Sequence, residues 1–247
     1  MAMRTEEMIG KISKEAKDNV RFEELRLGIP LGVNAADTIV LAQKRLKPIT
    51  VRNTCVTGAN KTQFIRRLLI TLSCINHAEE ACFIVLSPHA EYGELLRLGA
   101  VDFTVPYIRT KSDVAQAIST LKEMLYMRET GGGYPHIFLV LDGLEGLTDC
   151  NKNSDLEEYS AILDLFMRRT DVDVICGVDL GRSIFAGSPG TFLGKGNCLV
   201  TTREAGKADV TYVNEDASLT LPMPITYPSE PTVMESIIYL NALSANG

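Results

Sequence analysis

The chain has 247 residues, of which 45% are hydrophobic and 23% are charged, and its formal net charge is −6. This length is sufficient for one large α/β domain with a well-formed core, and no apolar run approaches the roughly 20 residues of a membrane span. The acidic balance argues against a large nucleic-acid footprint, which usually shows as a basic surface. It is still compatible with a local basic patch, or with a site shared across a ring of subunits.

The N-terminal stretch and the cysteines indicate the compartment. The chain begins MAMRTEEMIGKISKEAKDN, which is charged and amphipathic and lacks the apolar core of a signal peptide. The six cysteines form no CxxC pair, and most lie in apolar segments, so we interpret them as buried thiols in a reducing compartment. The three histidines form no metal-ligand spacing. We therefore expect a cytoplasmic protein without disulfides and without a membrane segment in this chain.

In chain order, strands and helices alternate through the middle of the sequence, which predicts βαβ units and a mostly parallel sheet. The last two predicted strands form an antiparallel pair that closes the sheet after this parallel part. Helices are predicted over 5–20, 61–74 and 113–128, from about 155 and from about 232. Strands are predicted within 25–33, 37–42, 48–57, 81–87, 136–142, 171–179, 198–202 and 208–213.

The stretch TGANKT, at residues 57–62, lies between a predicted strand and a predicted helix. A phosphate-binding loop has the pattern GxxxxGK[ST] at this position, with backbone N–H groups around the phosphates and a lysine on the terminal phosphates. Lys61 and Thr62 match the pattern, but Cys55 and Asn60 replace its two glycines. An ordinary strand–turn–helix with a solvated lysine is the alternative. The expected nucleotide-binding residues are Thr57, Gly58, Ala59, Asn60, Lys61 and Thr62.

The segment HIFLVLDGLEGL begins at His136 and contains an apolar strand that ends in Asp142. An apolar strand followed by aspartate is the Walker B pattern, in which the aspartate holds the Mg²⁺ shell. We therefore expect Thr62 and Asp142 as metal-site residues and Lys61 as a catalytic residue. Many such ATPases place a water-orienting glutamate directly after the aspartate. Here Gly143 stands there, and Glu145 is the expected substitute. The alternative is that Asp142 only begins an Asp-Gly turn.

The order of these segments resembles the motor domain of the FtsK/SpoIIIE family of DNA translocases, over roughly residues 28–213. The matching stretches are LGVNAADTIVLAQKRLKPITVRNTCVTGANKT, the segment ACFIVLSPHAEYGELLRLGAVDFTVPYIRTKSDVAQAISTLKEMLYMRE, HIFLVLDGLEGL and LGKGNCLVT. The resemblance implies a RecA-like P-loop NTPase fold with ATP and Mg²⁺ as ligands. It also implies a ring, or assembly with an active FtsK-like motor. We predict an N-terminal helical segment over 1–27 and a single FtsK-like domain over 28–247, with a C-terminal antiparallel addition to its sheet.

The chain departs from the family pattern at several catalytic positions. Besides Cys55 and Asn60 in the loop and Gly143 after Asp142, the run from Gly177 to Asp179 replaces a polar Thr-Gln sensor pair. No winged-helix module for reading DNA follows the motor. The secretion branch of the family, the EssC/EccC-type coupling ATPases, includes degenerate domains of this kind that engage protein substrates.

Three hypotheses follow from the sequence. The first, which we favour, is a degenerate nucleotide-binding domain with weak or absent ATP hydrolysis, which acts as a binding or assembly module. The second is an active ring-forming ATPase that translocates DNA, or protein substrates as in type VII secretion. The third is an unrelated doubly wound domain. Arg182 and Arg203 lie in or near the late motor region, as trans-acting arginines or as solvated surface residues.

Overall fold

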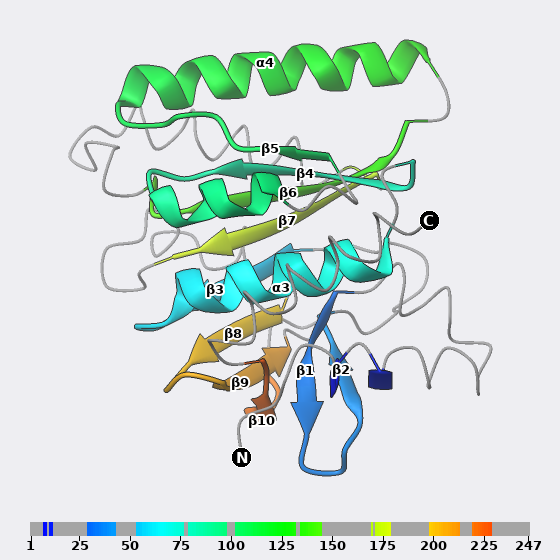
Figure 1. The fold of residues 1–247 in the computed structure, drawn as a ribbon, viewed down its shortest axis with the longest axis vertical. Helices are drawn as coiled ribbons and strands as arrows, with labels where there is room; N and C mark the ends of the chain where they lie inside the picture. The colour runs from blue at the N-terminus through cyan, green and yellow to red at the C-terminus, as the bar shows by residue number, and fades with distance from the viewer. Residues whose placement is uncertain are drawn as a thin grey trace.

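A ten-stranded mixed sheet forms the centre of the computed structural model (Figure 1). The residues that the structure describes are 7–8, 10–11, 29–42, 53–76, 79–97, 102–131, 134–144, 169, 171–178, 198–212 and 219–228. The predicted helices from about 155 and 232 lie outside these residues, as does most of the predicted helix over 5–20.

The sheet has a parallel part and an antiparallel part. The strand order is β2-β1-β10-β9-β8-β3-β7-β6-β4-β5, and the strands from β8 to β5 in this order are all parallel. The strands are β1 (Pro30–Asn34), β2 (Ile39–Leu41), β3 (Asn53–Thr57), β4 (Ala81–Leu86), β5 (Asp102–Thr104), β6 (His136–Asp142), β7 (Val172–Gly177), β8 (Cys198–Thr202), β9 (Lys207–Tyr212) and β10 (Met223–Thr226).

The predicted fold class is confirmed, with one extension. β8 and β9 pair antiparallel as expected, and β10 continues that part of the sheet. The N-terminal hairpin of β1 and β2 then pairs with β10, with Val33 opposite Thr226. The antiparallel addition therefore draws strands from both ends of the described chain.

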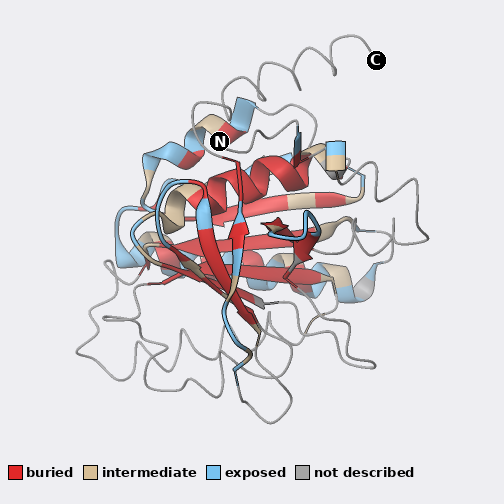
Figure 2. Cartoon of the chain, turned by 90° about the horizontal axis from the view of Figure 1, so that it is seen from below, coloured by how far each residue is buried: buried red, intermediate tan, exposed pale blue. Residues whose placement is uncertain are grey.

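Within the described residues, two helices and a 3-10 segment cover the sheet. α3 (Lys61–Ile75) and the 3-10 segment η1 (Ala90–Arg97) pack on one face, through a cluster that contains Phe64, Leu69 and Tyr92. α4 (Lys111–Thr130) packs on the other face through a second cluster. Buried residues are concentrated in the strands and in α3 (Figure 2). Strands buried on both faces explain why β4, β6 and β7 are near-continuous apolar runs in the sequence.

Two arginines of α3 are buried as well, although they lie off its apolar face. Arg66 and Arg67 are 7% and 4% exposed. Arg66 binds Glu94 of η1 at 2.7 Å. The guanidinium of Arg67 lies 5.4 Å from the ring centre of Tyr227, which itself packs edge-on against Phe64. Tyr227 directly follows β10, so these contacts pack the antiparallel part of the sheet against α3.

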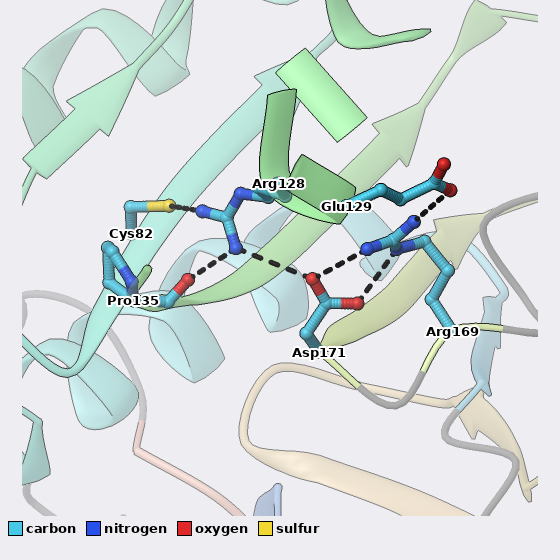
Figure 3. Close-up of polar contacts among 6 residues, drawn as sticks. All are labelled: Cys82, Arg128, Glu129, Pro135, Arg169 and Asp171. Atoms are coloured by element: carbon cyan, nitrogen blue, oxygen red, sulfur yellow. Dashed lines mark hydrogen bonds and ion pairs between the residues drawn. The ribbon is translucent and has the colours of Figure 1, made fainter. Parts of the chain in front are cut away.

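A network of charged side chains lies at the amino-terminal edge of the parallel strands (Figure 3). Arg128, in the last turn of α4, donates to the carbonyl of Pro135 at 2.7 Å and lies 3.6 Å from Asp171. Arg169 binds both carboxylate oxygens of Asp171, at 2.8 and 3.1 Å, and also binds Glu129. Because each guanidinium faces a carboxylate, we assign this cluster a structural role: it fixes the end of α4 to the starts of β6 and β7.

The described cysteines are free thiols, as expected. Burial raises the pKa of Cys74 and of Cys198 to about 12, so both are protonated and unreactive near neutral pH. Cys150 lies outside the described residues. No helix among the described residues is long and apolar enough to cross a membrane.

Candidate nucleotide-binding site

The two predicted motifs meet at the carboxyl-terminal edge of the parallel strands. β7 lies between β3 and β6 in the sheet, so the turn after β3 and the end of β6 open on the same side. Ligands of open α/β sheets bind at this edge. The hydroxyl of Thr62 donates a hydrogen bond to Oδ2 of Asp142 at 2.7 Å, across 80 positions of the sequence.

The turn before α3 is shorter than a full phosphate-binding loop. β3 pairs with β8 as far as Thr57, which lies opposite Thr201, so Cys55 is a buried strand residue and no loop glycine is needed there. The turn consists of Gly58, Ala59 and Asn60. Gly58 has a φ of +104°, and its carbonyl accepts from the N–H of Lys61 at 3.3 Å.

Asn60 points away from the space in front of α3. Its φ is −108°, so the turn does not depend on the tolerance of asparagine for unusual backbone angles. Its side-chain amide donates to the carbonyl of Arg203, in the turn between β8 and β9, at 3.2 Å. The side chain of Asn60, the N-cap residue, makes no capping hydrogen bond at the start of α3. Uncapped N–H groups at a helix start can bind an anion such as a phosphate.

Asp142 is fully buried, and polar groups surround one of its oxygens. Oδ2 accepts from the hydroxyls of Thr62, at 2.7 Å, and Tyr92, at 3.0 Å. Nε2 of His89 lies 3.9 Å from the same oxygen. Burial raises the pKa of the Tyr92 hydroxyl well above its usual value, and the charge of Asp142 raises it further, so Tyr92 remains a donor.

The other oxygen of Asp142, Oδ1, is buried and has no hydrogen-bond partner among the described residues. It lies against Gly177 at the end of β7. A Cβ atom at position 177 would be 2.0 Å from it. Gly177, which has no side chain, therefore makes room for this carboxylate. A buried carboxylate costs free energy unless it is paired or binds a metal, and the hydroxyls of Thr62 and Tyr92 bind only Oδ2, so Oδ1 is available to a further ligand.

The structure describes the remaining predicted residues except Glu145 and Arg182. Lys61 and Thr62 are the first residues of α3 and are half-buried. The ammonium of Lys61 has no ion-pair or hydrogen-bond partner within the described part of the chain. Ala59 is exposed at the turn. Glu145 lies outside the described residues. Arg203 forms an ion pair with Asp209 and is mostly exposed.

The oxygen atoms of Thr62 and Asp142 fit a Mg²⁺ ion that is bound together with a nucleotide. A carboxylate and a hydroxyl are oxygen ligands of the kind Mg²⁺ prefers, and protein sites for this ion usually supply one or two carboxylates while phosphates and water supply the rest. No group of three or more potential metal ligands occurs among the described residues. Thr62 and Asp142 are therefore suited to a nucleotide-bound Mg²⁺ and unsuited to binding the ion alone.

No family model and no curated protein sequence matches the chain. Among solved structures, the cytoplasmic domain of the type VII secretion ATPase EccC from Thermomonospora curvata has a TM-score of 0.60 and 13% identity over 87% of this chain. ATPases 2 and 3 of EssC from Geobacillus thermodenitrificans have a TM-score of 0.53 and 12% identity over 89%. A structure of the cytoplasmic domain of EssC has a TM-score of 0.50 and 14% identity over 82%.

These similarities define the fold class. The chain has the fold of a RecA-like P-loop ATPase domain, as the sequence predicted. Solved structures with this fold include the cytoplasmic domain of EccC and ATPases 2 and 3 of EssC. The chain spans 31% of the EccC chain, 49% of the chain with ATPases 2 and 3 of EssC, and 43% of the chain with the cytoplasmic domain of EssC.

Tyr92 is the site residue that sequence analysis missed. It comes from η1, which was not predicted, and 50 positions separate it from Asp142. No sequence motif predicts this role of Tyr92, because its contact with Asp142 depends on how the chain turns after β4. His89 follows the Ser87-Pro88 pair at the end of β4, and the sequence analysis assigned it no role.

Proposed function

We propose that this chain is an FtsK/SpoIIIE-like nucleotide-binding domain that binds MgATP at the carboxyl-terminal edge of its sheet and hydrolyses it slowly or not at all. The observation that carries the proposal is the 2.7 Å hydrogen bond between Thr62 and the buried Asp142 at the uncapped start of α3. P-loop NTPases bind phosphate with a lysine at the turn from a strand into a helix, and they bind Mg²⁺ with a carboxylate at the end of a nearby strand. This chain has the same arrangement.

Each residue has a role in this proposal. The Lys61 ammonium binds the terminal phosphates, and the N–H groups at the start of α3 bind phosphate oxygens. The Thr62 hydroxyl and the Asp142 carboxylate hold the metal, which neutralises phosphate charge when bound. Tyr92 fixes the orientation of the carboxylate through its hydrogen bond. Asn60 is directed toward Arg203 and so leaves the phosphate position open.

We expect slow ATP hydrolysis because position 143 and the turn before α3 lack groups that other P-loop ATPases use in catalysis. Catalysis of phosphoryl transfer is mainly positioning and charge stabilisation, and a residue that orients the attacking water is one of its recurring parts. Position 143 supplies no side chain for that purpose. The turn at Gly58–Asn60 also offers fewer backbone N–H groups than a full glycine-rich loop. We infer that the domain is used chiefly for nucleotide-dependent binding or assembly.

The assembly that we propose resembles that of secretion ATPases. The solved neighbours are longer chains, and one of them is described as containing ATPases 2 and 3 of EssC. By this analogy the domain, over 28–247, works beside further ATPase domains or in a ring, and a protein is the substrate that the assembly moves. The alternative is an active DNA translocase. Hydrolysis stimulated by DNA would favour it, whereas the net charge of −6 does not.

Removing the Lys61 ammonium is expected to weaken nucleotide binding strongly. Calorimetric titration of the wild type with MgATP and MgADP should show saturable binding, and Lys61→Ala should weaken it by roughly 100-fold or more, since a charge-assisted phosphate contact contributes about 1.5–3 kcal/mol and the cation also neutralises phosphate charge. Lys122→Ala is the matched control, because Lys122 is exposed on α4, on the opposite face of the sheet. It should bind as the wild type does.

Two results would contradict the proposal. Wild-type protein that binds no MgATP at millimolar concentration would show that this isolated domain has no working site. Binding that is equal in the wild type, Lys61→Ala and Lys122→Ala would place the nucleotide elsewhere. Steady-state phosphate release in the same samples separates the hypotheses, because turnover that depends on Lys61 and reaches ordinary ATPase rates would favour the active enzyme.

A further inference from the structure

The imidazole of His89 occupies the space into which a side chain at position 143 would project. Gly143 follows Asp142 directly and has a φ of +71°. A Cβ atom built on it would lie 2.5 Å from Nε2 and 3.1 Å from Cδ2 of His89. A side chain at position 143 and the observed position of His89 therefore exclude each other.

The backbone of His89 is held in place while the tip of its ring is open. Its N–H donates to the hydroxyl of Ser87 at 3.1 Å, and its carbonyl accepts from the N–H of Tyr92 at 3.4 Å. Tyr92 in turn binds Asp142. β4, which leads into this turn, is the neighbour of β6 in the sheet. These hydrogen bonds therefore hold the backbone of His89 in position beside the end of β6.

The ring itself remains available for a further contact. Its side chain is 40% exposed, in contrast to the fully buried Asp142 beside it. The distance of 3.9 Å from Nε2 to Oδ2 of Asp142 is longer than a hydrogen bond. Thr62 and Tyr92, the other polar side chains in contact with Asp142 among the described residues, are already hydrogen-bonded to it. His89 thus has a partly exposed ring whose Nε2 lies near Asp142 without a hydrogen bond to it.

We propose that His89 is the water-positioning residue of this site, in place of a side chain at position 143. The inference rests on the proposed function. In the step that it supports, the water oxygen forms a bond to the γ-phosphorus and the bond to the bridging oxygen breaks. ADP leaves with that electron pair, and the water proton ends on the released phosphate. A loose transition state of this kind needs an oriented water more than a strong base, so a ring nitrogen within hydrogen-bond reach of the water is sufficient.

Two substitutions at His89 test the proposal. His89→Ala removes the ring, and His89→Gln keeps a polar group of similar reach that can orient water. Single-turnover phosphate release should fall by about 100-fold in His89→Ala, since positioned groups that interact with the attacking water contribute about that much or more. His89→Gln should retain a substantial part of the rate. Glu91→Ala, at an exposed neighbouring position, is the control and should match the wild type.

A binding measurement provides a readout that does not depend on turnover. The complex of MgADP with aluminium fluoride imitates the transferring phosphate and its water. Calorimetry should show that His89→Ala binds this complex at least about tenfold more weakly than the wild type does, with unchanged affinity for MgADP and an unchanged melting temperature. A structural role alone would move both affinities together, or would lower the melting temperature.

The shared space gives a second readout without any nucleotide. Gly143→Ala should lower the melting temperature, both because its Cβ meets the ring and because alanine is strained at a positive φ. His89→Gly in the Gly143→Ala background should restore part of the loss. No restoration would show that the ring does not fill this space, and would overturn the inference.

The outcomes separate the inference from the proposed function. If the wild type binds MgADP and His89→Ala equals it in phosphate release and in affinity for the aluminium fluoride complex, the role of His89 is wrong and the nucleotide site stands. If the wild type binds neither MgADP nor MgATP, the proposed function fails and the role of His89 fails with it. Loss of phosphate release and of aluminium fluoride affinity in His89→Ala alone, with His89→Gln intermediate, is the result that we expect.

Discussion

Asp142→Asn is expected to raise the stability of the protein while abolishing Mg²⁺-dependent nucleotide binding. The Asp142 side chain is fully buried, only hydroxyls bind one of its oxygens, and the other has no partner among the described residues. A neutral amide can still accept from Thr62 and Tyr92 and removes the cost of burying a charge. Functional sites often carry such a cost, and relieving it commonly adds about 1–2 kcal/mol, which is roughly 2–8 °C in melting temperature.

The matched control for Asp142→Asn is a second buried carboxylate. Asp173, on β7, is also fully buried but lies 3.1 Å from Nε2 of His136. Asp173→Asn removes one partner of this pair, so it should lower the melting temperature and leave nucleotide affinity unchanged. An Asp142→Asn variant that melts below the wild type, or that binds MgATP with full affinity, would contradict the role assigned to Asp142.

Gly58→Ala is expected to lower the free energy of unfolding by about 2–4 kcal/mol, the sum of strain at a positive φ and of overpacking. The φ of Gly58 is +104°, and a Cβ atom there would lie 2.3 Å from the carbonyl oxygen of Thr202 and 2.5 Å from its hydroxyl. That hydroxyl donates to the carbonyl of Thr57 at 2.8 Å, so relief of the clash disturbs the pairing of β3 with β8. The melting temperature should fall by roughly 5–15 °C, and MgATP should bind more weakly because the turn before Lys61 moves.

The chain offers a control for the Gly58 substitution. Gly93, in η1, has no heavy atom within 4 Å of an added Cβ. Gly93→Ala should therefore change stability by no more than about 0.5 kcal/mol. Urea unfolding of both variants measures the difference, and equal stability of Gly58→Ala and Gly93→Ala would show that the turn is not built as described.

The buried parallel strands were predictable because their composition is unambiguous. β4, β6 and β7 are apolar along their whole length, and only the centre of a parallel sheet buries both faces of a strand. β5 was missed because it has three residues, of which Asp102 and Thr104 are exposed. β10 was missed for a similar reason, since its pattern is short and mixed and its pairing with β9 decides its conformation. Tertiary contacts therefore determine the elements that local sequence could not.

The site was predictable in its motifs and not in its surroundings. Strand order brings Thr62 and Asp142 to one edge, and the sequence of motifs was enough to expect both. The orientation of the Asn60 side chain depends on its hydrogen bond to the carbonyl of Arg203, which is 143 positions away. The contact of Tyr92 with Asp142 depends on the 3-10 turn after β4, which no local pattern specified. Side-chain directions of this kind follow from the packed structure alone.

We propose that Lys61, Thr62 and Asp142 form a site for a nucleotide together with its metal. Electron paramagnetic resonance of Mn²⁺, which replaces Mg²⁺, tests this directly when it is recorded with and without ATP. We expect Mn²⁺ to bind to the protein only when ATP is present, and Thr62→Val to remove this binding. Mn²⁺ bound equally without ATP, or bound with ATP equally by the wild type and Thr62→Val, would contradict it.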